Sequence, residues 1–592
     1  MRKFEQSRSN ASNALAFGNR SISAVLIAMF ICLPCGVALA QTVPSPSAID
    51  PANEIRRQED RDRAVRERAE PRVDIRSDAV SPIAPVRLPE SETPCFDVTK
   101  VELRGDEARR FEWVLGRLDG KDQDDSALGK CLGARGINVL LKRAQDALIV
   151  KGFVTTRVLA EPQDLKTGVL ALTIIPGRIH AIRFAPGTTN RAHAWNAVPA
   201  EPGDILNLRD IEQALENFLR VPSAKADIKI EPAEGPDAKP GYSDLVISYQ
   251  QSNPFRLSLN ADDSGTDGTG KYQGGITVSY DNWWTLNDLF YIMANHDLGG
   301  GDEGPRGTRG STVHYSAPFD YWTLGATVSN SRYYQTVAGA TQEFTYRGTS
   351  NNAEIKLSRL IYRDAKRKTT VALRAFQRKS NNYIDDTEVE VQRRIVGGWE
   401  ASAGHREFIG AATVDANLAY KRGTGAFESM AAPEEAFGEG TSRFALVTAD
   451  LNVNAPFKLA EQSLRYVGTL RIQNNRTSLT PQDRFAIGGR YTVRGFDGES
   501  SLSAERGWLL RNELGIALGA TGQEFYLGLD HGEVSGSSSE LLVGKRLTGA
   551  VIGLRGQFKN LQYDIFAGAP VRKPEYFRTA GSTAGFNLNL SF

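Results

Sequence analysis

Phe255-Arg256-Leu257-Ser258-Leu259-Asn260-Ala261-Asp262 and the last residues, Phe586-Asn587-Leu588-Asn589-Leu590-Ser591-Phe592, alternate apolar and polar side chains. Successive side chains of a strand point to opposite faces, so this alternation predicts strands with one apolar and one polar face. The pattern recurs between them at Leu464-Arg465-Tyr466 and Leu470-Arg471-Ile472-Gln473. Such strands, separated by Gly, Asn and Asp turns, are typical of a transmembrane β-barrel whose outer face meets lipid and whose lumen is wet.

The alternating region runs from residue 254 to residue 592. At about 20 residues per strand and turn, it has room for about 16 strands. A soluble β-sandwich or propeller gives a similar alternation. We favour the barrel because the chain also carries an export signal and an apolar, aromatic C-terminus. The predicted fold class is therefore mainly β, with a 16-stranded antiparallel transmembrane barrel at residues 252–592.

The composition excludes several other classes of protein. The chain has 592 residues, more than one core usually supports, so several domains are expected. A polytopic helical membrane protein is excluded because only residues 22–40 approach an uninterrupted apolar helix. The net charge of +1 gives no sign of a nucleic-acid-binding protein.

The first 40 residues have the pattern of a signal peptide. Arg2, Lys3, Arg8 and Arg20 precede an apolar stretch at residues 24–31, and Ala38-Leu39-Ala40 supplies small residues at the cleavage site. We expect cleavage before Gln41 and export from the cytoplasm. The alternative, a retained anchor helix, fits less well because the apolar run is short and ends in Pro34 and Gly36.

Two cysteines, Cys95 and Cys131, remain after cleavage. An even pair in an oxidising compartment predicts a disulfide, which would stabilise a small domain by about 3–4 kcal/mol. Two unpaired buried thiols are the alternative. We expect no metal site there, because two cysteines without an adjacent histidine make a poor ligand set.

Residues 41–94 divide into a charged helix and a linker. Asp50 is placed to cap a helix with Pro51 at its first position, and 12 of the 17 residues at 54–70 are charged. Without an apolar stripe, this helix must float in solvent or sit in a watery cavity, held by polar contacts with which water competes. Residues 71–94 contain five prolines and form an extended linker.

Two small α+β modules follow, at residues 95–177 and 178–251. The first is expected to have strands at 96–105, 153–159 and 169–175, with the apolar face of a helix at Ile137, Leu140, Leu141, Ala144 and Leu148. The second repeats this order, with strands at 178–184, 227–230 and 244–249 and a helix capped by Asn207. Modules this small are expected to leave a sheet edge exposed.

Several motifs resemble nucleotide-binding or catalytic motifs, but the residues around them exclude these functions. Residues 299–304 fit GxGxxG, but no helix follows to hold a pyrophosphate. Residues 265–271 come close to a P-loop, but Tyr272 stands where a Mg²⁺-binding hydroxyl is needed. The six histidines are scattered, and GxSxG does not occur. We therefore predict that the protein is not an enzyme and uses no nucleotide, metal or other cofactor.

One combination of motifs is specific. Val493-Arg494-Gly495-Phe496 is followed by Glu505-Arg506-Gly507-Trp508-Leu509-Leu510-Arg511-Asn512-Glu513-Leu514 and then by Leu529-Asp530-His531-Gly532. This resembles the two-partner secretion transporters, the outer-membrane exporters of hemolysins and filamentous hemagglutinins, which are related to the barrel assembly machinery. The likeness extends over most of the mature chain and includes Cys95, Gly136-Ile137-Asn138, residues 152–158, residues 162–168 and residues 210–217.

The resemblance implies a plug helix at about residues 50–70, two POTRA (polypeptide-transport-associated) domains, and a loop around residues 488–500 folded into the barrel lumen. It also implies a contact between Arg494 of the Val493–Phe496 signature and Asp530 on the wall, which a guanidinium fork can make bidentately. An exposed loop charge is the alternative for Arg494, and a solvated tether is the alternative for the helix. The plug residues implied in this sequence are Glu54, Arg57, Asp60, Arg61 and Arg66.

The resemblance further implies a function. We expect a pore in the bacterial outer membrane that exports a large secreted partner protein in unfolded form. The partner would dock by adding a strand to a POTRA edge in the periplasm. Outer-membrane lipid and lipopolysaccharide would surround a monomer, and no nucleic acid would bind. The alternatives are an assembly insertase, which resembles longer POTRA arrays, a passive porin, and a secreted β-rich enzyme.

Overall fold

The computed structural model describes residues 50–70, 72–77, 87–120, 124–236 and 238–592. The predicted signal peptide lies outside the described residues, as does part of the proline-rich linker.

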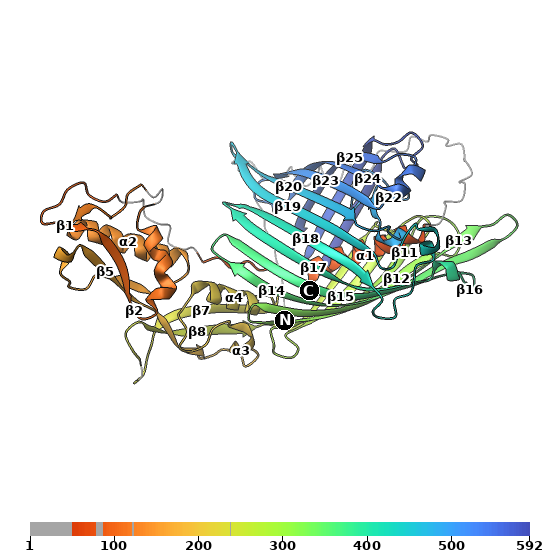
Figure 1. Ribbon diagram of the computed structural model, residues 1–592. Coiled ribbons are helices and arrows are strands. Elements are labelled where there is room, and N and C mark those ends of the chain that lie inside the picture. The colour runs from red at the N-terminus through yellow and green to blue at the C-terminus, as the bar shows by residue number, and fades with distance from the viewer. Residues whose placement is uncertain (1–49, 71, 78–86, 121–123, 237) are drawn as a thin grey trace, which may run out of the picture. The chain divides into compact units, whose positions relative to one another are not determined.

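In the described part, a closed antiparallel barrel of 16 strands occupies the C-terminal half (Figure 1). Its strands are β9 (Phe255–Asp262), β10 (Tyr272–Asp281), β11 (Leu289–Gly299), β12 (Gly307–Phe319), β13 (Trp322–Ala338), β14 (Glu343–Arg363), β15 (Arg367–Ile384), β17 (Arg394–Ile409), β18 (Ala412–Thr424), β19 (Ala445–Leu459), β20 (Gln462–Asn475), β23 (Arg506–Ala517), β24 (Glu524–Ser535), β25 (Arg546–Phe558), β26 (Leu561–Arg572) and β27 (Thr583–Ser591). A two-residue strand, β16 (Thr387–Glu388), pairs antiparallel with the end of β15. The predicted fold class is confirmed.

The barrel closes between its first and last strands. β27 pairs with β9, and Leu590 lies opposite Leu259. These are the two stretches whose alternation is most regular in the sequence, so the segments that define the barrel's ends are neighbours in space. The backbone of Phe592 extends the pairing by exchanging hydrogen bonds with Leu257.

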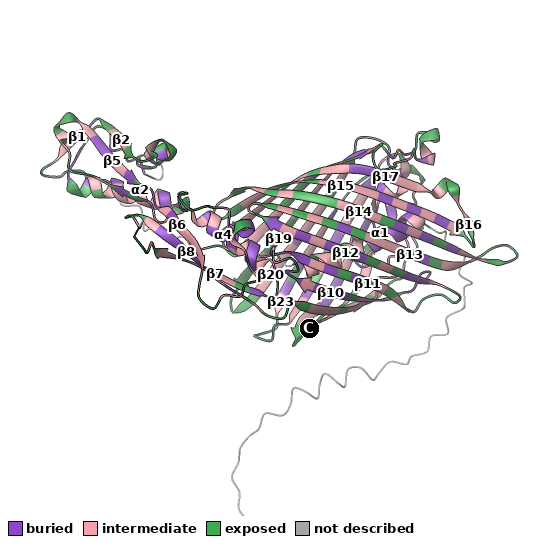
Figure 2. Ribbon diagram, turned by 90° about the horizontal axis from the view of Figure 1, so that it is seen from below, coloured by how far each residue is buried: buried purple, intermediate pink, exposed green. Residues whose placement is uncertain are grey.

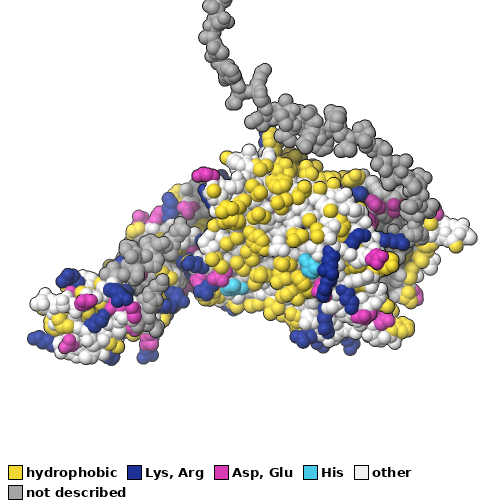
Figure 3. All heavy atoms as spheres, turned by 90° about the horizontal axis from the view of Figure 1, so that it is seen from above, with side chains coloured by type: hydrophobic (Ala, Val, Ile, Leu, Met, Phe, Trp, Pro, Cys, Tyr) yellow, Lys and Arg dark blue, Asp and Glu magenta, His cyan; other side chains and the backbone are white. Residues whose placement is uncertain are grey.

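The two faces of the barrel differ in polarity. Large apolar side chains are exposed on the outside, among them Ile276, Ile292, Leu324, Leu373 and Ile552. Figure 2 shows the exposed and less exposed positions alternating along the strands, and Figure 3 shows hydrophobic side chains gathered over the barrel surface. An apolar surface of this extent is typical of contact with lipid hydrocarbon. Among the described residues, no helix is both long enough and apolar enough to cross a membrane.

The first module consists of β1 (Phe96–Val98), β2 (Lys100–Gly105), η2 (Ala108–Arg117), β3 (Lys130–Leu132), α2 (Ala134–Val150), β4 (Arg157–Leu159), η3 (Leu165–Thr167) and β5 (Val169–Ile175). The strand predicted at 96–105 is two strands on different sheets: β1 pairs with β3, whereas β2 pairs with β5. The strand predicted at 153–159 begins only at Arg157. Alternation marks the face of a strand but not its partner, so the sequence could not show this division.

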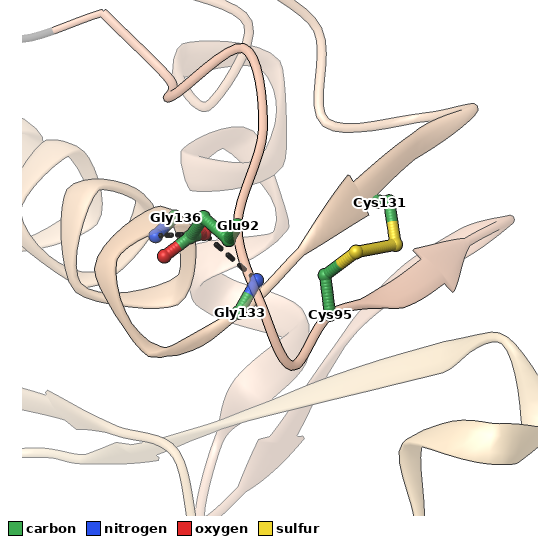
Figure 4. The surroundings of a disulfide bond; sticks show 5 residues. All are labelled: Glu92, Cys95, Cys131, Gly133 and Gly136. Atoms are coloured by element: carbon green, nitrogen blue, oxygen red, sulfur yellow. Dashed lines mark hydrogen bonds between the residues drawn. A yellow bond between two sulfur atoms is a disulfide. The ribbon is translucent and has the colours of Figure 1, made fainter.

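A disulfide and a carboxylate tie the linker's end to this module (Figure 4). Cys95 and Cys131 are bonded, with their Cα atoms 5.2 Å apart. Three residues earlier, Glu92 accepts hydrogen bonds from the backbone N–H groups of Gly133, Arg135 and Gly136 at 2.8–2.9 Å. These are unpaired donors of the first turn of α2, so Glu92 caps a helix distant from it in sequence.

The second module consists of β6 (Arg178–Phe184), α3 (Ala194–Ala197), α4 (Leu208–Leu219), β7 (Ala224–Pro232) and β8 (Tyr242–Gln251). β8 is the central strand, and β6 and β7 are the sheet edges. Asn207 caps α4 by accepting from the N–H of Arg209 at 2.9 Å. A buried core of Ile211, Phe218, Leu245 and Ile247 joins the helix to the sheet.

Helix α1 (Pro51–Ala69) precedes both modules in sequence and lies within the barrel (Figure 1). Asp50 accepts from the N–H of Asn53 at 3.1 Å, and Pro51 occupies the first helical position, which needs no N–H. The remaining elements are short connections: η4 (Glu390–Gln392), η5 (Pro433–Phe437), η6 (Pro481–Asp483), β21 (Phe485–Ile487), β22 (Leu502–Ala504) and η7 (Ser537–Leu541).

Candidate translocation pore

The loop between β20 and β23 lies against the inner wall of the barrel. At its tip, Arg494 donates to the Asp530 carboxylate on β24 from its backbone N–H at 3.0 Å, from Nε at 2.7 Å and from Nη2 at 2.9 Å. Arg494 is 8% exposed and Asp530 is 0% exposed. The pair is thus bidentate and nearly free of bulk water, the geometry in which a charge-assisted hydrogen bond is strongest.

A second carboxylate completes the pairing of Arg494. Its Nη1 donates to Oε2 of Glu513 on β23 at 2.7 Å, and Glu513 in turn pairs with Arg555 of β25. Arg511 Nε lies 3.7 Å from Asp530. The charges therefore alternate in sign along the wall, which lowers the cost of burying each one.

Two residues of this charged group, Glu513 and Arg555, were not predicted as site residues from the sequence. A signal for Glu513 was present, because it follows Arg511 by two residues and so lies on the same face of β23. Arg555 had no such signal, since its role depends on which strand lies beside β24.

The loop approaches the wall closely where the wall has no side chains. A Cβ atom at position 549 would lie 1.9 Å from the carbonyl oxygen of Arg494, and one at position 568 would lie 2.9 Å from the Cα atom of Gly495. Gly495 itself has φ +91°. Gly532 is also in contact, because a Cβ there would lie 2.9 Å from Val493 Cγ2. Glycines thus allow backbone to lie directly on backbone.

Apolar side chains hold the loop on both sides of Arg494. Val493 and Phe496 are buried in a small cluster with Leu509, Leu547 and Phe577. The rings of Phe496 and Phe577 meet edge to face with centroids 5.8 Å apart. Within the signature, Val493 and Phe496 therefore pack in the apolar cluster, Gly495 allows the turn, and Arg494 binds the charged wall.

Helix α1 contacts the barrel mainly through arginines. Arg61 is 2% exposed and donates to Ser264 Oγ and to Gln273 Oε1, both at 2.9 Å. Arg57 donates to the carbonyl oxygens of Gly265 and Gly498, the second of which belongs to the loop. Arg66 donates to Glu354 of β14 at 3.1 Å. These three side chains join the helix to the strands and to the loop.

The two implied acidic residues act within the helix. Glu54 accepts from Gln58 at 2.9 Å, and Asp60 pairs with Arg63 at 3.2 Å. The expectation that water competes for every contact of this helix is wrong, because Arg61 and Ile55 are buried. The sequence showed that the helix is charged but not how closely the wall and the β9–β10 connection would enclose it.

A cavity of about 1120 Å³ lies beside α1 in the lumen. Charged residues of both signs line it, from α1 (Glu59 and Arg63), from the loop (Glu499) and from the strands (Glu354, Arg374, Glu400, Lys421, Asp450 and Arg471). These charges keep much of the cavity hydrated, although apolar side chains such as Leu446, Ile472 and Phe485 also line it. Within the described residues, no group of three or more His, Cys, Asp and Glu side chains could hold a metal ion.

A family model described as haemolysin secretion/activation protein ShlB/FhaC/HecB matches residues 241–556. The chain belongs to this family. POTRA-domain models match residues 178–232 and, for the ShlB type, residues 96–177. The resemblance inferred from the loop signature is thereby confirmed, and the two modules are named POTRA 1 and POTRA 2 below.

Several known proteins are similar to this chain over more than four fifths of its length. An outer membrane transporter CdiB-2 of Burkholderia pseudomallei is 36% identical over 532 residues, covering 88% of this chain and 90% of that protein. An outer membrane transporter CdiB of Dickeya dadantii is 27% identical over 511 residues, covering 84% and 87%. The solved structure of CdiB from Acinetobacter baumannii has a TM-score of 0.80 and 29% identity, covering 92% of this chain and 100% of that chain.

Proposed function

We propose that this protein is an outer-membrane transporter that takes an unfolded partner protein from the periplasm and exports it to the cell surface. The main support for this proposal is the barrel, which has an apolar outer surface and charged residues in its lumen. Helix α1 lies in this lumen and is bound there mainly by polar contacts. A barrel built only to let small solutes diffuse needs neither this helix nor the two POTRA domains. Family membership favours export over the assembly insertase.

The POTRA domains are proposed to recognise the partner. Each has a three-stranded sheet, and β2, β4, β6 and β7 are the edge strands of these two sheets within the described residues. An edge strand offers free N–H and C=O groups to an extended chain, which gives affinity with little dependence on sequence. Such recognition suits a long substrate that arrives unfolded. We propose the boundaries 95–177 for POTRA 1 and 178–251 for POTRA 2.

We propose that α1 is a plug and that the Arg494 contact fixes the loop for transport. The buried bonds of Arg61 support a resting position in the lumen, and the bond of Arg57 to Gly498 would couple the helix to the loop that carries Arg494. The substrate would pass after α1 has moved, because α1 occupies the lumen through which it must travel.

The proposed setting is a single chain in the outer membrane, with the POTRA domains in the periplasm. A barrel closed by one chain supports a monomer, and the apolar outer surface supports contact with phospholipid and lipopolysaccharide. We propose no catalytic activity and no cofactor, in keeping with a pore.

Co-expression tests the proposal. The transporter would be expressed with each large secreted protein encoded beside its gene, and the culture medium would be analysed for that protein. We expect the partner in the medium only when the transporter is present. Retention of every candidate in the periplasm, with the barrel correctly assembled, would contradict export.

A further inference from the structure

The segment that follows α1 is held by its main chain. Ile75 N–H donates to Oε1 of Glu216 at 2.8 Å, and Ser77 N–H donates to Oε1 of Glu212 at 2.9 Å. Arg363 Nη2 donates to the carbonyl oxygen of Ile75 at 2.6 Å. The bonded N–H groups are two residues apart and so point to the same side, as in an extended strand.

Three side chains, Glu212, Glu216 and Arg363, bind this segment, and we call them the cradle. Glu212 and Glu216 lie one turn apart on α4 of POTRA 2, and Arg363 ends strand β14 of the barrel. Arg363 Nε donates to Glu212 at 3.1 Å, and its Nη1 and Nη2 donate to Glu216 at 2.9 Å each. The side chains of Glu212 and Arg363 are 1% and 3% exposed. The bonds among Glu212, Glu216 and Arg363 therefore hold these side chains in position in addition to their bonds to the segment.

Side-chain contacts of the segment lie at the margins of the cradle. Asp74 pairs with Lys368 and with Arg406, each at 2.8 Å. Arg76 lies over the ring of Phe408 at 4.3 Å. These partners belong to β15 and β17. The cradle itself therefore contacts peptide groups, which every residue except proline supplies in full.

The charged pairs at the margin of the cradle lie on the lumen cavity. Asp74, Lys368 and Arg406 line the same cavity as Arg57 of α1 and Glu499 of the loop. A polypeptide passing from POTRA 2 into the barrel could follow this lining from the cradle to the loop. The site is thus at the entrance of the path that the proposed function requires.

We infer that Glu212, Glu216 and Arg363 form a binding subsite for the extended main chain of the exported polypeptide, and that residues 72–77 occupy this subsite at rest. The inference rests on the proposed function. A subsite that reads peptide groups accepts any sequence in turn, which a transporter of a long chain needs. Because residues 72–77 follow α1 within a few residues of the chain, a substrate that displaces them also releases the end of the plug helix.

Proline substitution tests the inference without altering the cradle. Ile75→Pro with Ser77→Pro removes both bonded N–H groups. The probe is a fluorescein-labelled peptide with the sequence of residues 72–77, and its binding to the full-length protein in detergent is followed by anisotropy. We expect at least tenfold tighter binding than to the unaltered protein, whose own segment competes at a high effective concentration. Val73→Pro, which keeps both N–H groups, is the matched control and should bind like the unaltered protein.

Two further probes separate main-chain from side-chain recognition. A peptide in which Thr replaces Asp and both Arg should still bind the double-proline variant, whereas a peptide N-methylated at the residues equivalent to Ile75 and Ser77 should not. Equal binding of the N-methylated peptide, or equal binding of the probe to the variant and the unaltered protein, would overturn the inference.

Secretion distinguishes this inference from the proposed function. Where the unaltered transporter secretes a partner, Glu212→Ala with Glu216→Ala should lower secretion several-fold while the barrel still assembles. Undiminished secretion would overturn the subsite and leave the exporter intact. Absence of secretion by the unaltered transporter would count against the exporter, while the peptide measurements still test the cradle.

Discussion

At the scale of single residues, Arg494 shows how one side chain can fix a loop. Its guanidinium binds two carboxylates, and its own carbonyl oxygen and the next residue rest on glycines of the wall. Lysine, a point charge without a fork, could not bind Asp530 bidentately while also pairing with Glu513. The charge matters here because the site excludes water.

Arg494→Ala should release the loop and reduce partner secretion at least tenfold. Removing one member of a buried ion pair costs about 3–5 kcal/mol, and we expect the lower end because Arg555 still pairs with Glu513. The barrel should still insert, as judged by its resistance to unfolding in cold detergent. Arg494→Lys should have an intermediate effect, and secretion equal to that of the unaltered protein would contradict the role given to the loop.

The contribution of Glu92 to the stability of the folded state is expected to depend on pH. Burial raises the pKa of its carboxyl, but bonds from Gly133, Gly136 and Arg135 outweigh burial and hold the pKa below its ordinary value of 4.5. The folded state thus favours the carboxylate, so its stabilisation is present above about pH 4.5 and is lost as the pH falls through the folded-state pKa.

We therefore expect Glu92→Gln to weaken the protection of α2 against hydrogen exchange at pH 7, and the difference from the unaltered protein to shrink on acidification below about pH 4.5. Exchange measured by mass spectrometry at each pH provides the comparison. Glu112→Gln, at an exposed position of POTRA 1, is the control. A difference that stayed constant down to pH 3 would show that Glu92 acts without its charge.

At the scale of elements, helix α1 is highly charged and yet lies in the lumen with several of its side chains buried. Its arginines reach polar groups of the wall, and Ile55 and Ala52 fill the small apolar part of its interface. The helix is thus held by several moderate contacts whose partners, such as Ser264 and Gln273, water can replace once the helix leaves.

Deletion of residues 51–69 should raise the single-channel conductance of the protein in planar lipid bilayers, because it empties much of the lumen. Arg61→Ala should give intermediate behaviour, with more frequent openings, since it removes the most buried contact of the helix. Arg68→Ala, at an exposed position, is the matched control. Unchanged conductance after the deletion would favour the solvated-tether interpretation.

The disulfide also connects two elements, because it joins the end of the linker to β3. Cys95 and Cys131 are separated by 36 residues, and a loop of that length makes a crosslink worth about 3–4 kcal/mol through the unfolded state. Cys95→Ser with Cys131→Ser should lower the stability of POTRA 1 by about that amount, measured by pulse proteolysis in urea. The unaltered protein in reducing agent should match the variant, and an unchanged midpoint would contradict the estimate.

At the scale of the whole molecule, the lumen sets the form of the cargo. Even after α1 has left, the loop held by Arg494 occupies part of the lumen, whereas a folded domain of 100 residues has a radius of gyration of about 13 Å. We therefore expect a chain to enter only in extended form, on a route from POTRA 2 past the charged residues that line the lumen.

A partner protein fused to a small domain locked by internal disulfides should therefore stall during export. Its N-terminal part would reach the surface while the fusion domain remained in the periplasm, as protease accessibility on whole cells would reveal. The same fusion with the domain's cysteines replaced by serine is the control and should be exported. Release of the locked, folded domain into the medium would refute passage in unfolded form.

The sequence predicted much of this architecture because several signals are local. Alternation along β9 and β27 gave the barrel and the polarity of its faces. The Val493–Phe496 signature gave the loop, and Asp50-Pro51 gave the start of α1. The sequence did not reveal the bond of Glu92 to α2, the part played by Glu513 and Arg555, or the cradle around residues 72–77. Each of these joins segments whose closeness depends on strand register or domain docking.

By itself, then, the sequence determined which residues face lipid and which face the lumen, because a strand's period of two residues is written in its side chains. It also determined that a charged helix and two small modules precede the barrel. Only the tertiary structure decided which inward charges meet, because closing the barrel sets β23, β24 and β25 side by side and brings Arg494 onto Asp530. It likewise decided that α4 of POTRA 2 and the end of β14 grip one extended segment, since hydrogen bonds depend on distances that no local pattern specifies.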